Sequence, residues 1–154
     1  MNIERARASR RSLAHWDLLA PAPTPVWALP QLARELDVAA IGVKDESARS
    51  PLGSFKVLGA PVALLRLIQR RCPHLSDEAL LAGLHAGELQ DLVAISATDG
   101  NHGRALAAAA RSVGCRCVIV LHAQVSAERE QAQTPQEFES FRTNPQERSP
   151  ARTA

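Results

Sequence analysis

Lys56 is the residue of this sequence with the clearest capacity for chemistry. It follows Ser54 and Phe55 after a glycine-containing turn, and the apolar residues beyond it have the spacing of one helix face. A lysine amine at a helix start, backed by apolar side chains, can lose its proton and condense with an aldehyde as a Schiff base. A lysine in such a position is more often an ordinary exposed residue. Lys56 alone therefore does not decide the function.

A second candidate is the glycine-rich turn Thr98–Gly103 (TDGNHG), which lies between an apolar run and an alanine-rich run. Its glycines allow the backbone to approach a ligand, and a helix behind the turn would favour a bound carboxylate or phosphate. Asn101 offers an amide that can donate to an oxygen on a flat ring, and Asp99 is a candidate acid or base. The alternative is a helix-capping turn whose polar side chains satisfy free backbone N–H groups. His102 is more simply explained as a packed or surface histidine.

The elements expected around this turn form a βαβ pattern. Residues 91–97 have the composition of a buried strand, residues 104–113 that of a helix ending at Gly114, and residues 117–121 that of a second buried strand. This order predicts an α/β fold with a parallel sheet and a right-handed crossover. Ligands of such sheets bind at the carboxyl ends of the strands, which is where the turn falls.

The segment before Lys56 is expected to be extended and then to form a short strand. Residues 18–30 hold four prolines, which exclude a regular helix. Residues 31–36 have the composition of a short helix, and residues 39–44 suit a buried strand.

Two further helices are expected after Lys56. Pro61 predicts a kink or a helix start near Gly59, since proline is tolerated only in the first turn of a helix. A second helix is expected over residues 76–84, with Ser76 at its amino end.

Composition limits the class of protein. The chain of 154 residues is long enough for one domain, and its 45% hydrophobic and 22% charged content is that of a globular protein. The net charge of +2 is too small to indicate nucleic acid, and no apolar run is long enough for a membrane span or a signal peptide. We therefore expect a cytoplasmic protein with no nucleic-acid or membrane partner. The spacing of Cys72, Cys115 and Cys117 does not fit a zinc site, so no metal is expected.

Four stretches carry a family resemblance: TPVWALPQLA, VKDES, LGSFKVLGA and SATDGNHGRALA. Together they resemble the N-terminal part of fold-type II pyridoxal-phosphate enzymes, which share the architecture of the tryptophan synthase β chain. Within that family the sequence is most similar to diaminopropionate ammonia-lyases. Dehydratases for threonine and serine typically have Ser-x-Gly-Asn where this chain has Thr98-Asp99-Gly100-Asn101, followed here by His-Gly-Arg.

The resemblance implies pyridoxal 5'-phosphate as the cofactor and a small amino acid as the substrate. Lys56 would bind the cofactor as a Schiff base and act as an acid/base at the substrate α-carbon. Asn101 would donate to the phenolic oxygen of the cofactor, and Asp99 would be a second acid/base. The turn would hold the substrate carboxylate through Thr98, Asp99, Gly100, Asn101, His102 and Gly103. The implied reaction is α,β-elimination of 2,3-diaminopropionate to pyruvate and ammonia.

The resemblance covers roughly residues 24–131. We expect a basic leader over residues 1–17, part of a catalytic region over residues 18–131, and a disordered, unrelated tail over residues 132–154. The glycine-rich phosphate loop of the family and the partner of the pyridine nitrogen have no counterpart in the sequence. A truncated region would present half of a cleft and expose apolar surface, through which it could form a homodimer.

Two alternatives stay open. The first is a threonine or serine dehydratase-like enzyme. The second is a non-catalytic remnant or small module that uses the turn to bind an anion.

Overall fold

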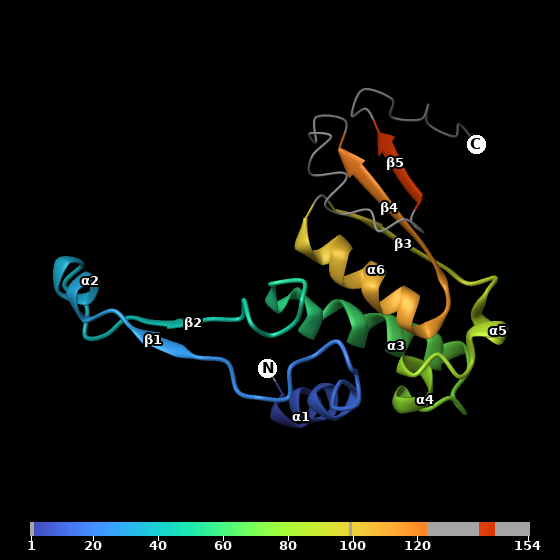
Figure 1. Ribbon diagram of the computed structural model, residues 1–154, viewed down its shortest axis with the longest axis horizontal. Helices are drawn as coiled ribbons and strands as arrows, with labels where there is room; N and C mark the ends of the chain where they lie inside the picture. The colour runs from blue at the N-terminus through green and yellow to red at the C-terminus, as the bar shows by residue number, and fades with distance from the viewer. Residues whose placement is uncertain (1, 99, 123–138, 144–154) are drawn as a thin grey trace, which may run out of the picture.

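The computed structural model describes residues 2–98, 100–122 and 139–143, with side chains for residues 2–98 and 100–121. These residues form a body built on a parallel sheet and an arm that extends away from it (Figure 1). Lys56 and the glycine-rich turn both belong to the body, whereas the arm is a two-stranded hairpin with a short helix.

A parallel sheet of order β3-β4-β5 forms the centre of the body. β3 (Val93–Ala97) and β4 (Arg116–His122) are parallel neighbours, and α6 (Asn101–Val113) connects them. The predicted βαβ unit and the α/β class are therefore confirmed. α6 packs on one face of this sheet, and α3 (Ala60–Arg71) packs beside α6 (Figure 1).

β5 (Glu139–Thr143) lies in the part of the chain for which we expected disorder. It pairs in parallel with β4, from Val118 opposite Glu139 to His122 opposite Thr143. The strand holds a phenylalanine and a threonine, which are favoured in strands, and β4 offers a free edge on which the backbone of β5 satisfies its hydrogen bonds. The other residues of 132–154 lie outside the described residues.

α6 begins three residues earlier than the sequence predicted, so that Asn101 is its first residue. Gly100 precedes it with extended backbone and no side-chain cap. The helix ends as predicted at Gly114, whose φ of 80° is left-handed and whose N–H donates to the carbonyl oxygens of Ala110 and Arg111. An alanine-rich helix needs no side-chain cap to form when its apolar face is buried, as it is here.

Lys56 lies in a short 3-10 helix, η1 (Phe55–Leu58), that leads directly into α3. Ser54 caps η1 by accepting a hydrogen bond from the Lys56 N–H at 3.2 Å. Pro61 falls in the first turn of α3, where its missing N–H costs no helical hydrogen bond. The helix start predicted near Gly59 is confirmed.

The core lies between α3, α6 and the sheet. Its largest fully buried side chains are Leu, Ile and Val residues and one proline, contributed by several elements: Leu65, Ile68, Leu80, Ile119, Leu121, Val57, Val113 and Pro61. Cys115 and Cys117 are buried in the same cluster, and burial raises the pKa of the Cys117 thiol to about 11. Both thiols therefore remain protonated at neutral pH and act as small apolar side chains.

The basic N-terminal segment forms a helix, α1 (Ile3–Ser12), that none of the sequence patterns indicated. The helix itself buries no residue, but Leu13 and Trp16 after it belong to the core. The indole Nε1 of Trp16 donates to the hydroxyl of Ser112 on α6 at 2.9 Å. This segment is therefore fixed to the body through Leu13 and Trp16 and through Ser9 of α1, whose hydroxyl accepts a hydrogen bond from Arg66 of α3 at 2.8 Å.

Two short helices, α4 (Asp77–Leu81) and α5 (Ala86–Leu89), connect α3 to β3. Ser76 caps α4 as predicted, by accepting a hydrogen bond from the Ala79 N–H. The helix is shorter than the predicted 76–84 because Gly83 adopts a φ of 71°, which ends helical geometry. α5 was not predicted.

The arm consists of β1 (Val26–Ala28), α2 (Pro30–Glu35) and β2 (Gly42–Lys44). The short helix predicted over 31–36 is confirmed by α2. The prediction of a buried strand over 39–44 is wrong, because β2 has only three residues and all are exposed. The reason is that β2 pairs with β1 in an antiparallel hairpin outside the parallel sheet, and neither strand packs a face on the body (Figure 1).

No helix in the described part of the chain is long and apolar enough to cross a membrane.

Candidate functional site

The segment before Lys56 is held by short-range hydrogen bonds. The carboxylate of Asp45 accepts from both the N–H and the hydroxyl of Ser47, at 2.9 and 2.6 Å. These bonds lower the pKa of the Asp45 carboxyl, and the bond from the Ser47 hydroxyl contributes most to the lowering. Gly53 then turns the chain with a φ of 61°, a conformation that favours glycine, and Ser54 begins η1. Lys56 is thus placed at the start of η1 by a loop with its own fixed geometry.

The turn after β3 places Asn101 at the first position of α6. The N–H of Thr98 donates to the carbonyl oxygen of Val120 on β4 at 3.2 Å, which fixes the turn at the carboxyl end of the sheet. The side chain of Asn101 is exposed, and its oxygen is 3.5 Å from the guanidinium of Arg104. Asp99, the predicted second acid/base, lies outside the described residues.

The two glycines of the turn differ in what surrounds them. A Cβ added to Gly100 would meet no atom within 4 Å, so this backbone is open to a ligand. A Cβ on Gly103 would lie 3.1 Å from the Thr98 methyl carbon and 3.4 Å from Ile119. The small size of Gly103 therefore lets α6 pack closely against β4, and a ligand can approach the turn most closely at Gly100.

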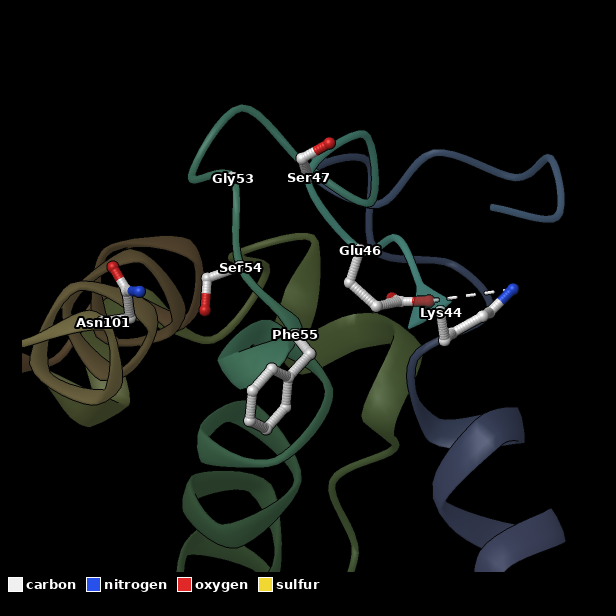
Figure 2. Close-up of a pocket in the computed structure, with 7 residues that line it drawn as sticks. All are labelled: Lys44, Glu46, Ser47, Gly53, Ser54, Phe55 and Asn101. Carbon is white, nitrogen blue, oxygen red and sulfur yellow. Dashed lines mark ion pairs between the residues drawn. The ribbon is translucent and has the colours of Figure 1, made fainter. Parts of the chain in front are cut away.

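A cavity of about 480 Å³ joins the two segments. Its lining comes from the loop and η1 on one side and from the start of α6 on the other: Lys44, Glu46, Ser47, Gly53, Ser54, Phe55 and Asn101. Figure 2 shows the hydroxyl of Ser54 and the amide of Asn101 on facing sides of this space. Residues far apart in sequence thus form one polar wall at the carboxyl end of β3.

Lys56 borders this cavity through its neighbours and does not line it. Its Nζ lies 4.6 Å from the centre of the Phe55 ring, in a cation–π contact. Phe55 itself lines the cavity and is 56% exposed. The amine therefore lies against a residue that lines the cavity, although Lys56 itself does not line it.

Glu46 and Arg49 form a partly buried network on the same wall. Arg49 donates from Nε to one carboxylate oxygen of Glu46 at 2.7 Å and from a terminal nitrogen to the other at 3.1 Å. The hydroxyl of Thr24 donates to Glu46, and the amine of Lys44 donates to the Thr24 carbonyl oxygen at 2.6 Å. The Arg49 and Thr24 hydrogen bonds lower the pKa of Glu46 to about 2. The carboxylate is therefore ionised over the whole physiological range.

This network fastens the extended segment before the arm to the wall of the cavity. The backbone N–H of Ala20 donates to the Arg49 carbonyl oxygen at 2.9 Å, and that of Asp45 donates to Pro25 at 3.0 Å. Glu46 had no role in the sequence analysis beyond its place in the VKDES stretch of the family resemblance. The available signal was the placement of Glu46 three residues before Arg49, a spacing suited to an ion pair.

Two predicted substrate-binding residues are placed differently from the rest. His102 is exposed and faces a second cavity between α3 and β3, and it does not line the cavity that contains Asn101. Thr98 is half-buried behind Gly103. The structure thus brings Asn101 and the Lys56 segment together and leaves His102 on the far side of the α6 start.

Comparison with models of protein families shows which family the chain belongs to. Residues 18–136, well over half of it, match the model of the pyridoxal-phosphate dependent enzymes. The chain belongs to this family. The match spans both segments that form the cavity wall, and the family resemblance expected from the sequence is confirmed.

Known enzymes resemble this chain both in sequence and in fold. The diaminopropionate ammonia-lyase of Escherichia coli K12 is 40% identical over 100 residues, which are 64% of this chain and 25% of that enzyme. The crystal structure of the Escherichia coli enzyme in apo form superposes with a TM-score of 0.72 at 34% identity, over 91% of this chain and 37% of that one. Its complex with an aminoacrylate-PLP azomethine reaction intermediate gives 0.70 at 34% identity, over 91% and 34% of the two chains.

The architecture is therefore part of the fold-type II fold, and the chain spans about a quarter of the length of the curated relatives it matches.

Proposed function

We propose that this chain binds pyridoxal 5'-phosphate through Lys56 and Asn101 and serves the α,β-elimination of 2,3-diaminopropionate to pyruvate and ammonia. The observation that carries the proposal is the shared cavity wall. η1 and the start of α6 meet at the carboxyl end of β3, in a chain that is 40% identical over 100 residues to a diaminopropionate ammonia-lyase.

The residues at this wall fit a flat, polar ring. The Asn101 amide can donate to a ring oxygen, and the Ser54 hydroxyl faces the same space. The backbone over Gly100 is open, so the ring can lie close to the start of α6, where the helix dipole favours negative charge. When bound, the cofactor supplies the electron sink that makes removal of the α-proton possible.

Lys56 would act in two ways. Its amine would leave the Phe55 ring and reach the cavity, where it would hold the cofactor covalently, and once released by substrate it would move a proton at the substrate α-carbon. Asp99 would be the second acid/base. The free N–H groups at the start of α6 and the Thr98–Gly103 turn would hold the substrate carboxylate.

The chain offers a clean test because it contains only two lysines, Lys44 and Lys56. Lys44 lines the cavity but donates to Thr24 and lies 3.9 Å from Glu46. The purified protein is incubated with pyridoxal phosphate, reduced with borohydride and mapped by peptide mass, beside Lys56→Ala and Lys44→Ala variants. We expect the adduct on Lys56, lost in Lys56→Ala and retained in Lys44→Ala.

An adduct on Lys44, or one that persists in Lys56→Ala on the N-terminal amine, would contradict the assignment of Lys56. If Lys56 is labelled, release of pyruvate and ammonia from 2,3-diaminopropionate is then measured, with serine and threonine as competing substrates. Faster turnover of serine or threonine would favour the dehydratase alternative.

A further inference from the structure

The helix α1 carries arginines on the side that faces away from the body. Residues 2–12 contain four of them, Arg5, Arg7, Arg10 and Arg11, against one acidic residue. Arg7, Arg10 and Arg11 are three and four residues apart, so they lie on one face of the helix. All three are exposed. We call these three residues the arginine stripe.

The contacts of α1 with the body fix the direction of the stripe. The half-buried residues of the helix are Ala8, Ser9 and Ser12, which lie nearly opposite the stripe. On this side the guanidinium of Arg66, in α3, donates to the hydroxyl of Ser9 at 2.8 Å, and Leu13 enters the core directly after the helix. In Figure 1, α3 and α6 lie between α1 and the sheet. The stripe therefore faces solvent and lines neither of the two cavities described above.

The positive charge of α1 is poorly compensated within the described part of the chain. Arg7 pairs with Glu4 at 3.0 Å, but both side chains are exposed, and such pairs contribute little. Arg10 and Arg11 form no ion pair with any described residue. Cations in the last turn stabilise a helix, which accounts for Arg10 and Arg11, whereas Arg5 lies in the first turn, where a positive charge is unfavourable. Helix stability therefore does not explain the four arginines together.

The composition of α1 narrows the class of partner. Ile3 is its only large apolar side chain and no residue of the helix is buried, so it has no apolar face to insert into a lipid surface. Its basic residues are all arginines, whose guanidinium groups bind phosphate oxygens through paired hydrogen bonds. The helix contains no aromatic residue on which an unpaired base could stack. These features favour the backbone of a nucleic-acid duplex.

We propose that the arginine stripe binds the phosphate backbone of double-stranded nucleic acid without reading its sequence. A duplex carries one negative charge per about 1.7 Å of its axis, so several phosphates lie within reach of a helix about 15 Å long. The net charge of +2 gave no reason to expect this partner, because it averages over the whole chain and conceals the local excess in α1. The inference does not depend on the cofactor or on the reaction proposed above.

The test measures binding of the full chain to a fluorescein-labelled DNA duplex of about 20 base pairs, by fluorescence anisotropy between about 20 and 200 mM salt. The variant replaces Arg7, Arg10 and Arg11 together by glutamine, which has a similar helix propensity. We expect binding at the lowest salt to weaken at least about tenfold. The slope of the logarithm of the binding constant against the logarithm of the salt concentration should fall in magnitude by about 2.7, as expected for three lost phosphate contacts.

A matched control separates the position of the charges from their number. Arg34→Gln, Arg70→Gln and Arg71→Gln together remove the same charge from exposed positions outside α1. This variant should bind within about threefold of the unchanged chain, because charges beyond a Debye length from the duplex are screened. Circular dichroism checks that both variants are folded. Lysine at the three positions of the stripe keeps the charge and should keep the salt dependence.

Several results would overturn the proposal. An equal loss of binding in the two glutamine variants would assign the binding to net charge, and loss of the salt dependence in the lysine variant would mean that the substitutions act through the fold. Equally tight binding of polyglutamate would assign the stripe to an acidic polypeptide, and tighter binding of phosphatidylserine vesicles would assign it to a lipid surface. A preference of more than about tenfold between two unrelated duplex sequences would contradict binding through the backbone alone.

Discussion

The amine of Lys56 lies 4.6 Å from the centre of the Phe55 ring, and the ring, not the amine, lines the cavity that contains Asn101. The Phe55 ring thus binds the Lys56 amine through a cation–π contact, and Lys56 does not line the cavity. Phe55 is one of the large apolar side chains that the fold leaves exposed, so its position is not explained by core packing.

Phe55→Leu should release the amine toward the cavity. A cation–π contact at an exposed site is worth about 0.5–1 kcal/mol, so we expect formation of the Lys56 adduct with pyridoxal phosphate to be about 2–5 times faster. The rate is followed by borohydride trapping and peptide mass at successive times. Labelling of Lys44 in the same variant should not change. A slower rate at Lys56 would mean that the ring orients the amine for reaction.

The Glu46–Arg49 ion pair predicts a specific dependence of stability on pH. The pKa of Glu46 is about 2 in the folded chain, against an ordinary value of 4.5. Because the folded-state pKa is lowered, the stabilisation is present in full above about pH 4.5 and is lost as the pH falls toward 2. Glu46→Gln should reduce the free energy of unfolding by about 1–2 kcal/mol at neutral pH, after allowance for solvent screening.

Urea unfolding of both proteins at several pH values checks this prediction. The difference between them should shrink below about pH 4.5 and vanish near pH 2. Asp91→Asn, which removes an exposed carboxylate just before β3, is the control for the change of a carboxylate to an amide. A difference between Glu46→Gln and the unchanged chain that is constant with pH would contradict the ionic origin of the stabilisation.

Replacement of Gly114, at the end of α6, should destabilise the fold strongly. Its φ is 80°, and a Cβ there would lie 2.3 Å from the Cβ of Ala86 and 2.7 Å from its Cα. Gly114→Ala combines backbone strain with a clash against α5, so we expect a loss of more than about 2 kcal/mol in unfolding free energy. Gly87→Ala is the matched control, because a Cβ at Gly87 meets nothing within 4 Å and alanine favours its helix. Thermal unfolding of the two variants separates these effects.

The parts of the fold that follow local rules were predictable from sequence. The β3–α6–β4 unit was found because two short apolar runs flank an alanine-rich segment that ends in glycine. The start of α3 was found because Pro61 restricts where a helix begins. In both cases one residue type fixes the backbone irrespective of what packs around it.

The parts that depend on tertiary contacts were not predictable. The strand β2 was expected to be buried because its sequence is apolar, but pairing with β1 places it in the exposed arm. At the candidate site, Lys56 and Asn101 follow from their motifs, whereas the roles of Ser54 and Phe55 depend on which way each side chain turns. No spacing rule specifies that direction, since neighbouring residues of a short 3-10 helix point to different sides.

Ser54 and Ser76 allow positioning of Lys56 to be separated from ordinary helix capping. Each hydroxyl accepts a hydrogen bond from a backbone N–H at the start of a helix, Ser54 from Lys56 at 3.2 Å and Ser76 from Ala79 at 3.1 Å. Replacement of either serine by alanine should cost about 1 kcal/mol of stability. Only Ser54→Ala should also reduce the yield of the Lys56 adduct, because only this cap orients the start of η1 at the cavity. Chemical unfolding gives the first quantity and borohydride trapping the second. An equal loss of adduct in Ser76→Ala would mean that the yield follows global stability, and the hydroxyl of Ser54 would then have no positioning role.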